Sequence, residues 1–182
     1  MALGIDFKDV EESQDYGDRP GAGVYCCKIA AVEHKPDKQY VLAYLDFADG
    51  DFKGRGKAIE DRTGQMWGYI SCYFSYKPKA LGMTKHNIAL VAESSKCDAA
   101  KLCDDFNSSE GNALVGKYIG IVIGEQEYEK QDGSVGVRFK LPKLVLVQDA
   151  KNNPEKFKVP ELEKLAGRPA EKSSVIDEEV PF

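Results

Sequence analysis

Apolar side chains along the 182-residue chain gather in five runs of strand character, each bounded by turn residues. The first two runs, at 24–32 and 40–47, are rich in β-branched and aromatic residues and are separated by Pro36-Asp37-Lys38. A third run at 66–74 follows a turn signal that ends at Gly64. Two more, at 117–129 and 135–147, are joined through an Asp-Gly turn that is typical of a hairpin. Because Pro142 lies inside the last run, we expect an edge position or a bulge there.

The period changes between the third and fourth runs. Thr84 is expected to cap a helix, and helical spacing then relates Ile88, Val91, Ala92, Ala99, Leu102, Cys103 and Phe106. Three strands, a helical connection and two further strands is the element order of the OB-fold. A β-sandwich fits less well, because it needs more strands and no helix in mid-chain. The sequence therefore predicts an all-β fold with a helical insertion: a five-stranded OB-fold barrel with a helix between strands 3 and 4, plus a disordered C-terminal tail.

Composition divides the chain into three parts. Residues 1–20 carry two basic and six acidic side chains and form an acidic extension. Residues 21–148 hold the barrel. Apolar periodicity stops beyond 148, and Lys, Glu, Pro and Ser dominate 149–175, which predicts a flexible linker with a short helix at 160–166 and an acidic tip at the end.

Charge and composition exclude several classes of protein. The net charge of −5 is unfavourable for a nucleic-acid binder, but residues 25–80 carry nine basic against seven acidic side chains, and local patches govern binding. No apolar run is long enough to span a membrane, and the first residues lack the pattern of a secretory signal. Five cysteines without CxxC spacing and two histidines make a zinc site improbable. We expect reduced cysteines and a cytoplasmic protein with no metal and no cofactor.

Aromatic residues alternate along the third run. Strand geometry places Trp67, Tyr69, Ser71 and Tyr73 on one face, with Gly68, Ile70, Cys72 and Phe74 on the other. An exposed row of rings is a platform for unstacked bases. The alternative is that these rings belong to the barrel core, and the neighbouring residues favour the platform. If Val41, Ala43, Leu45 and Phe47 point inward, Tyr40 and Tyr44 point outward beside the platform.

Basic residues flank this platform. The connection before the third run supplies Lys53, Arg55 and Lys57, interleaved with glycines that permit close approach of a phosphate backbone. Lys77 and Lys79 follow the run, and the late hairpin adds Tyr128, Arg138 and Lys140. The alternative is a solvated loop and a solvated strand face. Together these residues predict a binding surface for single-stranded nucleic acid.

Other chemistry is weakly signalled. The stretch Gly54 to Ala58 lacks the spacing of a phosphate-binding loop and has alanine where that loop needs a hydroxyl. Asp46, Asp49 and Asp51 could hold a metal, but Asp49-Gly50-Asp51 reads more simply as a turn. Neither histidine has a nucleophile pattern beside it, so no enzyme is expected.

The end of the chain is the most specific signal. Three carboxylates stand directly before an apolar tip in the sequence Ile176, Asp177, Glu178, Glu179, Val180, Pro181 and Phe182. A basic pocket with apolar walls can bind such an end by capturing the terminal carboxylate and the Phe182 ring. The tip therefore predicts recruitment of partner proteins.

The ending IDEEVPF resembles the acidic tip of bacterial single-stranded-DNA-binding proteins. The stretches GAGVYCCKIAAVE, YVLAYLDFADGDFKGR and RFKLPKLVLV are similar to bacteriophage single-stranded-DNA-binding proteins of Gram-positive hosts. The resemblance implies sequence-non-specific protection of single strands during replication, recombination and repair, in the host cytoplasm if the genome is a phage's. It also implies a homo-oligomer, because the bacterial family is tetrameric, although the acidic first 20 residues and the helical insertion at 84–115 depart from that family.

Two alternatives stay open. The barrel could instead bind a peptide or protein and act as an interaction adaptor, because fold alone does not decide function. It could also be a recombination mediator that loads a recombinase and holds DNA only weakly.

Overall fold

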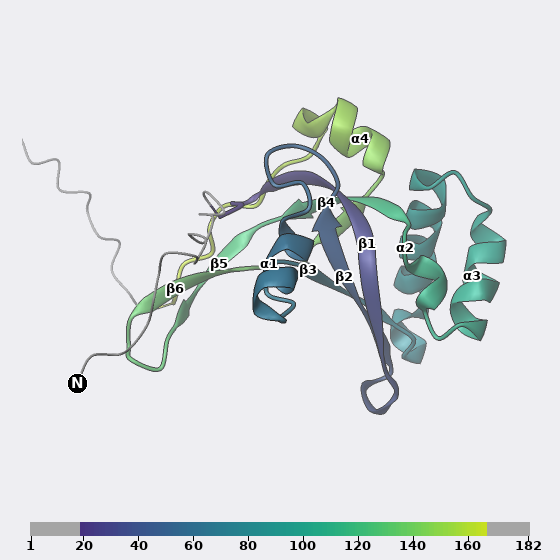
Figure 1. Ribbon diagram of the computed structural model, residues 1–182, viewed down its shortest axis with the longest axis horizontal. Helices are drawn as coiled ribbons and strands as arrows, with labels where there is room; N and C mark the ends of the chain where they lie inside the picture. The colour runs from purple at the N-terminus through teal and green to yellow at the C-terminus, as the bar shows by residue number, and fades with distance from the viewer. Residues whose placement is uncertain (1–18, 167–182) are drawn as a thin grey trace, which may run out of the picture.

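Strand β1 (Gly23–Lys35) is the centre of a strongly curled antiparallel sheet (Figure 1). The computed structural model describes residues 19–166. β1 is long enough to pair on both sides, with β4 (Tyr118–Ile123) along its first half and β2 (Tyr40–Phe47) along its second. The register against β2 shifts between Ile29 and Ala31, and such a bulge bends a strand. The bend lets one strand serve both halves of the sheet.

The sheet contains five strands, in the order β3 (Ile70–Ser75), β2, β1, β4 and β7 (Lys143–Val145). Strands β5 (Glu125–Glu129) and β6 (Val135–Phe139) form a separate hairpin that extends away from the sheet in Figure 1. The expected runs at 117–129 and 135–147 are thus each divided, at Gly124 and around Pro142. The predicted five-stranded barrel is present in part: the sheet is a strongly curled half-barrel that does not close, because among the described strands β3 pairs only with β2.

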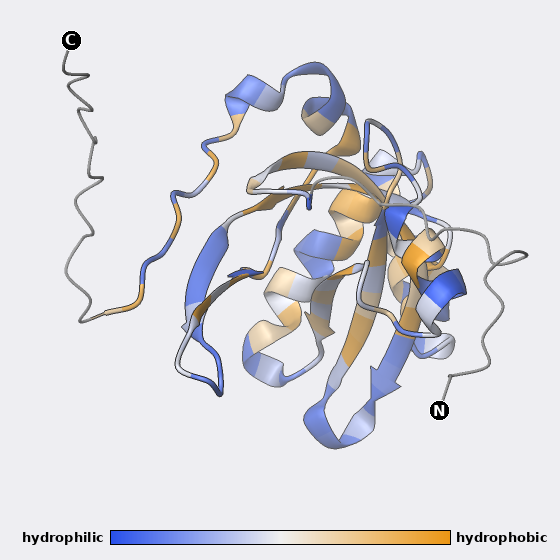
Figure 2. Ribbon diagram, turned by 60° about the vertical axis from the view of Figure 1, so that its left-hand side comes forward, coloured by the Kyte–Doolittle hydropathy of each residue, from blue (hydrophilic) through white to orange (hydrophobic). Residues whose placement is uncertain are grey.

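The core lies inside the curl, where strand alternation places the apolar side chains. Val41, Ala43, Leu45 and Phe47 are buried, as are Ile70, Cys72 and Phe74, so the predicted inward faces of two strands are confirmed. Helices α2 (Leu81–Ser94) and α3 (Ala99–Ser108) pack side by side and cover one side of the core. The Phe74 and Phe106 rings meet with centroids 6.1 Å apart. Figure 2 shows the apolar residues gathered on the inner strands and on a helix that packs against them.

Helix α1 (Arg55–Thr63) occupies the stretch where the sequence predicted a glycine-rich loop. Its first turn is held by Asp46, whose carboxylate accepts hydrogen bonds from the backbone N–H groups of Gly56 at 2.7 Å and Lys57 at 3.1 Å. These N–H groups have no partner within the helix, and a carboxylate there also complements the helix dipole. Gly54 enters the helix with a φ of 71°, which favours glycine. Asp46 is therefore a capping residue.

Two helix predictions were wrong. Thr84 does not cap α2; it lies in the first turn of that helix, where its hydroxyl donates to the Ser75 carbonyl at 2.6 Å. Residues 160–166 form no helix. Glu163 instead pairs with Gln126 as a short parallel bridge along β5.

Residues beyond 148 continue as ordered structure up to 166, where the sequence predicted a flexible linker. Helix α4 (Val147–Asn152) packs on β1 and β4. Short 3₁₀ turns complete the described elements, at Pro36–Lys38, Pro78–Ala80, Asn112–Leu114 and Pro154–Lys156. Most of the predicted acidic extension (1–18) and the acidic tip (176–182) lie outside the described residues. Within 19–166, no helix is long and apolar enough to cross a membrane.

Candidate nucleic-acid interface

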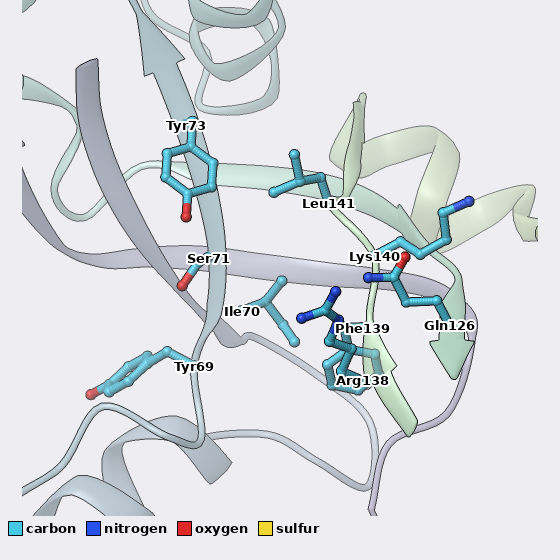
Figure 3. Close-up of a pocket in the computed structure, with 9 residues that line it drawn as sticks. All are labelled: Tyr69, Ile70, Ser71, Tyr73, Gln126, Arg138, Phe139, Lys140 and Leu141. Atoms are coloured by element: carbon cyan, nitrogen blue, oxygen red, sulfur yellow. The ribbon is translucent and has the colours of Figure 1, made fainter. Parts of the chain in front are cut away.

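A groove of about 630 Å³ separates the free edge of β3 from the β5–β6 hairpin (Figure 3). One wall comes from β3 and the residue before it, with Tyr69, Ile70, Ser71 and Tyr73. The opposite wall comes from the hairpin and the residues that follow it, with Gln126, Arg138, Phe139, Lys140 and Leu141. Among the described residues that line the groove there are two cations and no carboxylate. The groove therefore favours an anionic ligand.

The hairpin wall is built as a stacked layer. The Tyr128 ring lies over Gly136, where a Cβ atom would meet ring carbon Cε1 at 2.7 Å, so only glycine permits this packing. The Arg138 guanidinium stands 5.5 Å from the centroid of the same ring. With its amide oxygen turned to Arg138, Gln126 accepts from Nε at 2.7 Å and from Nη2 at 3.0 Å. These contacts hold Arg138 in place, and Figure 3 shows its guanidinium pointing from β6 toward β3.

The tyrosines of β2 and β3 form edge-to-face pairs. Tyr40 and Tyr73 meet with ring centroids 4.9 Å apart, and Tyr44 and Tyr69 with centroids 6.2 Å apart. Tyr73 is 43% exposed, and Tyr40 and Tyr44 are partly exposed, as the outward orientation requires. The structure thus places these three rings together on one sheet face.

Tyr69 does not present its ring to solvent, contrary to the sequence prediction. The residue is only 8% exposed, because α1 packs across it: a Cβ atom on Gly56 would come within 2.6 Å of the Tyr69 ring. The hydroxyl donates to the Glu60 carboxylate at 2.5 Å. Burial, and then the hydrogen bond to Glu60, raise the pKa of this phenol well above its usual range. Tyr69 closes one end of the groove.

Trp67 precedes β3 and does not belong to it. The predicted strand began at residue 66, but β3 starts at Ile70, and Trp67 lies in the turn between α1 and β3. Its side chain is 77% exposed, the largest exposed fraction among the large apolar residues described. A ring so placed is free to stack on a base.

Cations lie beyond both ends of β3. Near the Tyr69 end, Lys53 precedes α1, and Arg55 and Lys57 lie in its first turn, with Lys57 paired to Asp61 on the next turn. Lys77 and Lys79 follow Ser75 at the other end and are exposed. None of these five lines the groove itself. The sequence predicted that all five belong to the binding surface. That surface would have to extend beyond the groove to include them.

Sequence reasoning missed three parts of this site. Gln126 lies two residues before Tyr128 on the same strand face, so the period of two could have identified it. Leu141, 70% exposed at the groove rim, carries no such signal. Glu163 binds Lys140 with an Oε2–Nζ distance of 2.6 Å, and this hydrogen bond holds the pKa of the glutamate below its usual range. No local pattern reveals a partner 23 positions away.

Three of the five cysteines, Cys26, Cys27 and Cys72, are buried, and the Asp46 carboxylate is engaged by backbone N–H groups. Asp46 serves α1, and no group of three metal-ligating side chains occurs within 19–166. Burial raises the pKa of Cys26 to about 11 and that of Cys72 to about 12, so these thiols are protonated at neutral pH.

No family model matches this chain, and no curated protein matches it either. Neither comparison therefore assigns a ligand to the groove.

Proposed function

We propose that this protein binds single-stranded DNA without strong sequence preference, and that the groove between β3 and the hairpin is the centre of its binding surface. The observation that carries the proposal is the lining of that groove. The exposed Tyr73 ring stands on one side and Arg138 and Lys140 on the other, and among the described residues no carboxylate lines the groove. Phosphates and bases are the two parts of a nucleotide that such walls accommodate.

The topology supports an OB-fold whose barrel is open along one seam. β1, β2 and β3 form the first meander, and α2 and α3 follow β3. The pairs β4–β5 and β6–β7 then correspond to the fourth and fifth strands, each broken once. In this fold the second and third strands and the adjoining loops bind oligonucleotides. The groove and the tyrosine face occupy that position.

Binding would divide between rings and cations. Trp67, Tyr73 and Tyr40 offer faces or edges to unstacked bases, each ring contributing roughly 1–3 kcal/mol. Arg138 and Lys140 would neutralise phosphates, and the lysines beyond β3 would extend that path. A duplex keeps its bases stacked and paired, so it offers this surface only its backbone. Single strands are therefore the preferred ligand.

The wider role rests on the end of the sequence. The tip from Ile176 to Phe182 would recruit replication, recombination or repair proteins, in keeping with its resemblance to bacterial single-stranded-DNA-binding proteins. Protection of a phage genome in the host cytoplasm is the role proposed for the whole chain. No catalytic step, metal or cofactor is part of this proposal.

Fluorescence tests the proposal directly, because Trp67 is the only tryptophan. Titration with oligo-dT should quench its emission with micromolar or tighter affinity, and the affinity should fall as salt rises, since phosphate contacts release counterions. A duplex of equal length is the control and should bind far more weakly. Equal binding of the two forms would refute the proposal.

A protein-interaction adaptor is the second candidate, and the open edge of β3 favours it. A sheet edge without a neighbouring strand accepts an extended peptide by backbone pairing. An adaptor of this kind leaves Trp67 emission unchanged on addition of oligo-dT at low salt. The same titration therefore separates the two candidates.

A further inference from the structure

The backbone of β3 presents unpaired hydrogen-bonding groups to the groove. Tyr76 N–H donates to the Gln39 carbonyl at 3.0 Å, directly beyond the β2–β3 ladder, and this bond fixes which pairs are hydrogen-bonded. In an antiparallel ladder such pairs alternate. The β3 residues that pair with β2 through the backbone are therefore Ile70, Cys72 and Phe74. Those between them direct their N–H and C=O groups to the free edge.

The free-edge residues are Ser71, Tyr73 and Ser75. The Ser75 carbonyl is taken by the Thr84 hydroxyl at 2.6 Å, which confirms that this side of β3 faces away from β2. The N–H and C=O groups of Ser71 and Tyr73 have no hydrogen-bond partner among residues 19–166. Both residues line the groove. Backbone groups in such a position require a partner, either water or ligand.

The opposite wall is open in the same way. Lys140 N–H donates to the Gly124 carbonyl at 2.9 Å, so alternation directs the backbone of Phe139 and Leu141 away from β5. The Val137 carbonyl, on that same edge, accepts from Arg19 Nη1 at 3.0 Å. The groove is thus a seam between two strand edges, where a closed barrel would have a hydrogen-bonded ladder.

We propose that the free edge of β3 recognises the Watson–Crick edges of DNA bases through the backbone groups of Ser71 and Tyr73. This inference rests on the proposed function and names the part of DNA that the groove reads. Single-stranded bases carry unused donors and acceptors on that edge, while a duplex has none to offer. Backbone N–H and C=O groups serve any base, because each base has both donors and acceptors. Selection of single strands without strong sequence preference follows from the same contact.

Phosphates take the other side of the groove. Arg138 and Lys140 are held on the hairpin, so a strand whose bases point to β3 directs its backbone toward these cations. The Tyr73 ring lines the seam, Trp67 lies three residues before β3, and both would stack on neighbouring bases. Edge recognition is therefore added to stacking, and the two contributions are separable by experiment.

Modified DNA separates them without altering the protein. Oligo-dT and an oligomer of N3-methylthymidine of equal length share phosphates and ring faces, but the methyl group removes the N3–H donor and covers the pairing edge. One or two lost hydrogen bonds should weaken binding about tenfold, given about 0.5–1.5 kcal/mol for each. Stacking and phosphate contacts alone predict equal affinities. Quenching of Trp67 emission measures both oligomers.

Two variants of Ser71 place the effect on the β3 edge. Ser71→Pro removes the edge N–H and no ladder bond, and proline is tolerated on edge strands. Ser71→Ala keeps that N–H and is the matched control. Ser71→Pro should lose several-fold affinity for oligo-dT and little for the methylated oligomer, whereas Ser71→Ala, which loses only the hydroxyl, should keep the preference for oligo-dT over the methylated oligomer. Circular dichroism and thermal unfolding confirm that both variants fold.

The outcomes distinguish this inference from the function on which it rests. If the unaltered protein fails to bind oligo-dT, the proposed function falls. If it binds both oligomers equally, the function stands and edge recognition is wrong. Equal affinity of the two Ser71 variants for oligo-dT would also overturn the inference. The methylation comparison needs no variant, so it decides the matter even if Ser71→Pro does not fold.

Discussion

Aromatic side chains around β3 lie in different environments, and the difference determines what each substitution does. Trp67 is 77% exposed and Tyr73 43% exposed, so neither ring contributes much to the core. Tyr69 is packed under α1 and hydrogen-bonded to Glu60. The first two rings are accessible to a ligand, and the third supports one wall of the groove.

Trp67→Ala and Tyr73→Ala should each weaken binding of oligo-dT by roughly 1–3 kcal/mol while leaving the unfolding midpoint nearly unchanged. Tyr69→Ala should instead lower the free energy of unfolding by about 3–5 kcal/mol, as buried aromatic truncations do. Tyr69→Phe, which keeps the ring, is the control. Urea unfolding and oligo-dT binding by anisotropy measure the two quantities. If the Tyr69→Ala protein is as stable as the unaltered protein but fails to bind oligo-dT, then Tyr69 is a binding residue and not a structural one.

The sequence predicted part of this picture. Alternation placed Ile70, Cys72 and Phe74 in the core and turned Tyr73 outward, because a strand with one buried face allows no other register. It failed for Tyr69, whose burial depends on a helix packed from outside the sheet. Alternation within a strand carries no information on what covers its outer face. The sequence favoured an exposed platform for all three rings, but the structure buries Tyr69 and exposes Trp67 and Tyr73.

At the scale of elements, the packing of α1 on the sheet depends on Gly56. A Cβ atom there would stand 2.6 Å from the Tyr69 ring and 2.9 Å from Asp46 Oδ1. Gly56→Ala should therefore destabilise the protein by about 1–3 kcal/mol, as overpacking does. Gly82, in α2, has no atom within 4 Å of its would-be Cβ, so Gly82→Ala should stabilise by roughly 0.5–1 kcal/mol through helix propensity. Urea unfolding of both variants checks the contrast, and losses of equal size would contradict it.

The segment after α4 is bound to the hairpin by backbone contacts. Glu163 N–H donates to the Glu125 carbonyl at 3.0 Å, and Glu127 N–H donates to the Glu163 carbonyl at 2.8 Å. The polar composition of this segment predicted a linker, because polar side chains offer little apolar surface to bury in a folded structure. Backbone pairing needs no apolar side chains, so this strand-like segment leaves no hydrophobic pattern. The break of the last run near Pro142 was indicated by the proline, but the outward course of the hairpin was not.

Glu163 is paired with Lys140, so under the proposed function it would compete with phosphate for this cation. Glu163→Gln should raise the affinity for oligo-dT at low salt and add about 0.7 to the magnitude of the log–log salt slope, as one further phosphate contact does. Acidification should act in the same direction: the pair is formed above the lowered pKa of Glu163 and is lost as pH falls through it. Anisotropy titrations across a salt series measure the slope.

The matched control lies on the same segment. Glu161→Gln removes an equal charge two residues earlier, and Glu161 forms no ion pair with a described residue. Its salt slope should match that of the unaltered protein. If both variants gain affinity equally, general charge reduction explains the effect and the specific competition at Lys140 does not.

At the scale of the whole molecule, an acidic protein presents a cationic groove because its charges are segregated. The net charge is −5, yet no described carboxylate lines the groove. Six acidic side chains fall within the first 20 residues, and three more stand directly before the last three. The charge distribution along the sequence anticipated this separation, but only the fold shows which cations, Arg138 and Lys140, line the groove.

The tip should act independently of the groove. Removal of Asp177 to Phe182 deletes three side-chain carboxylates and the Phe182 ring, and these residues lie outside those the structure describes. Capture of partner proteins should be abolished, because both the ring and the acidic run that a basic, apolar pocket recognises are lost. Affinity for oligo-dT should stay equal or rise slightly at low salt, since acids tethered to a cationic groove compete with phosphate and salt screens that competition.

Phe182→Ala separates the two effects, because it keeps the acidic run and the terminal carboxylate while it removes the anchor. It should lose partner proteins and retain the DNA affinity of the intact chain at every salt concentration. The measurement pairs a pull-down of purified host replication and repair proteins with an oligo-dT titration, for the intact, truncated and Phe182→Ala proteins. A truncated protein that loses DNA binding but retains its partners would contradict both assignments. The tip would then supply the DNA contacts that are assigned here to Arg138, Lys140 and the β3 edge.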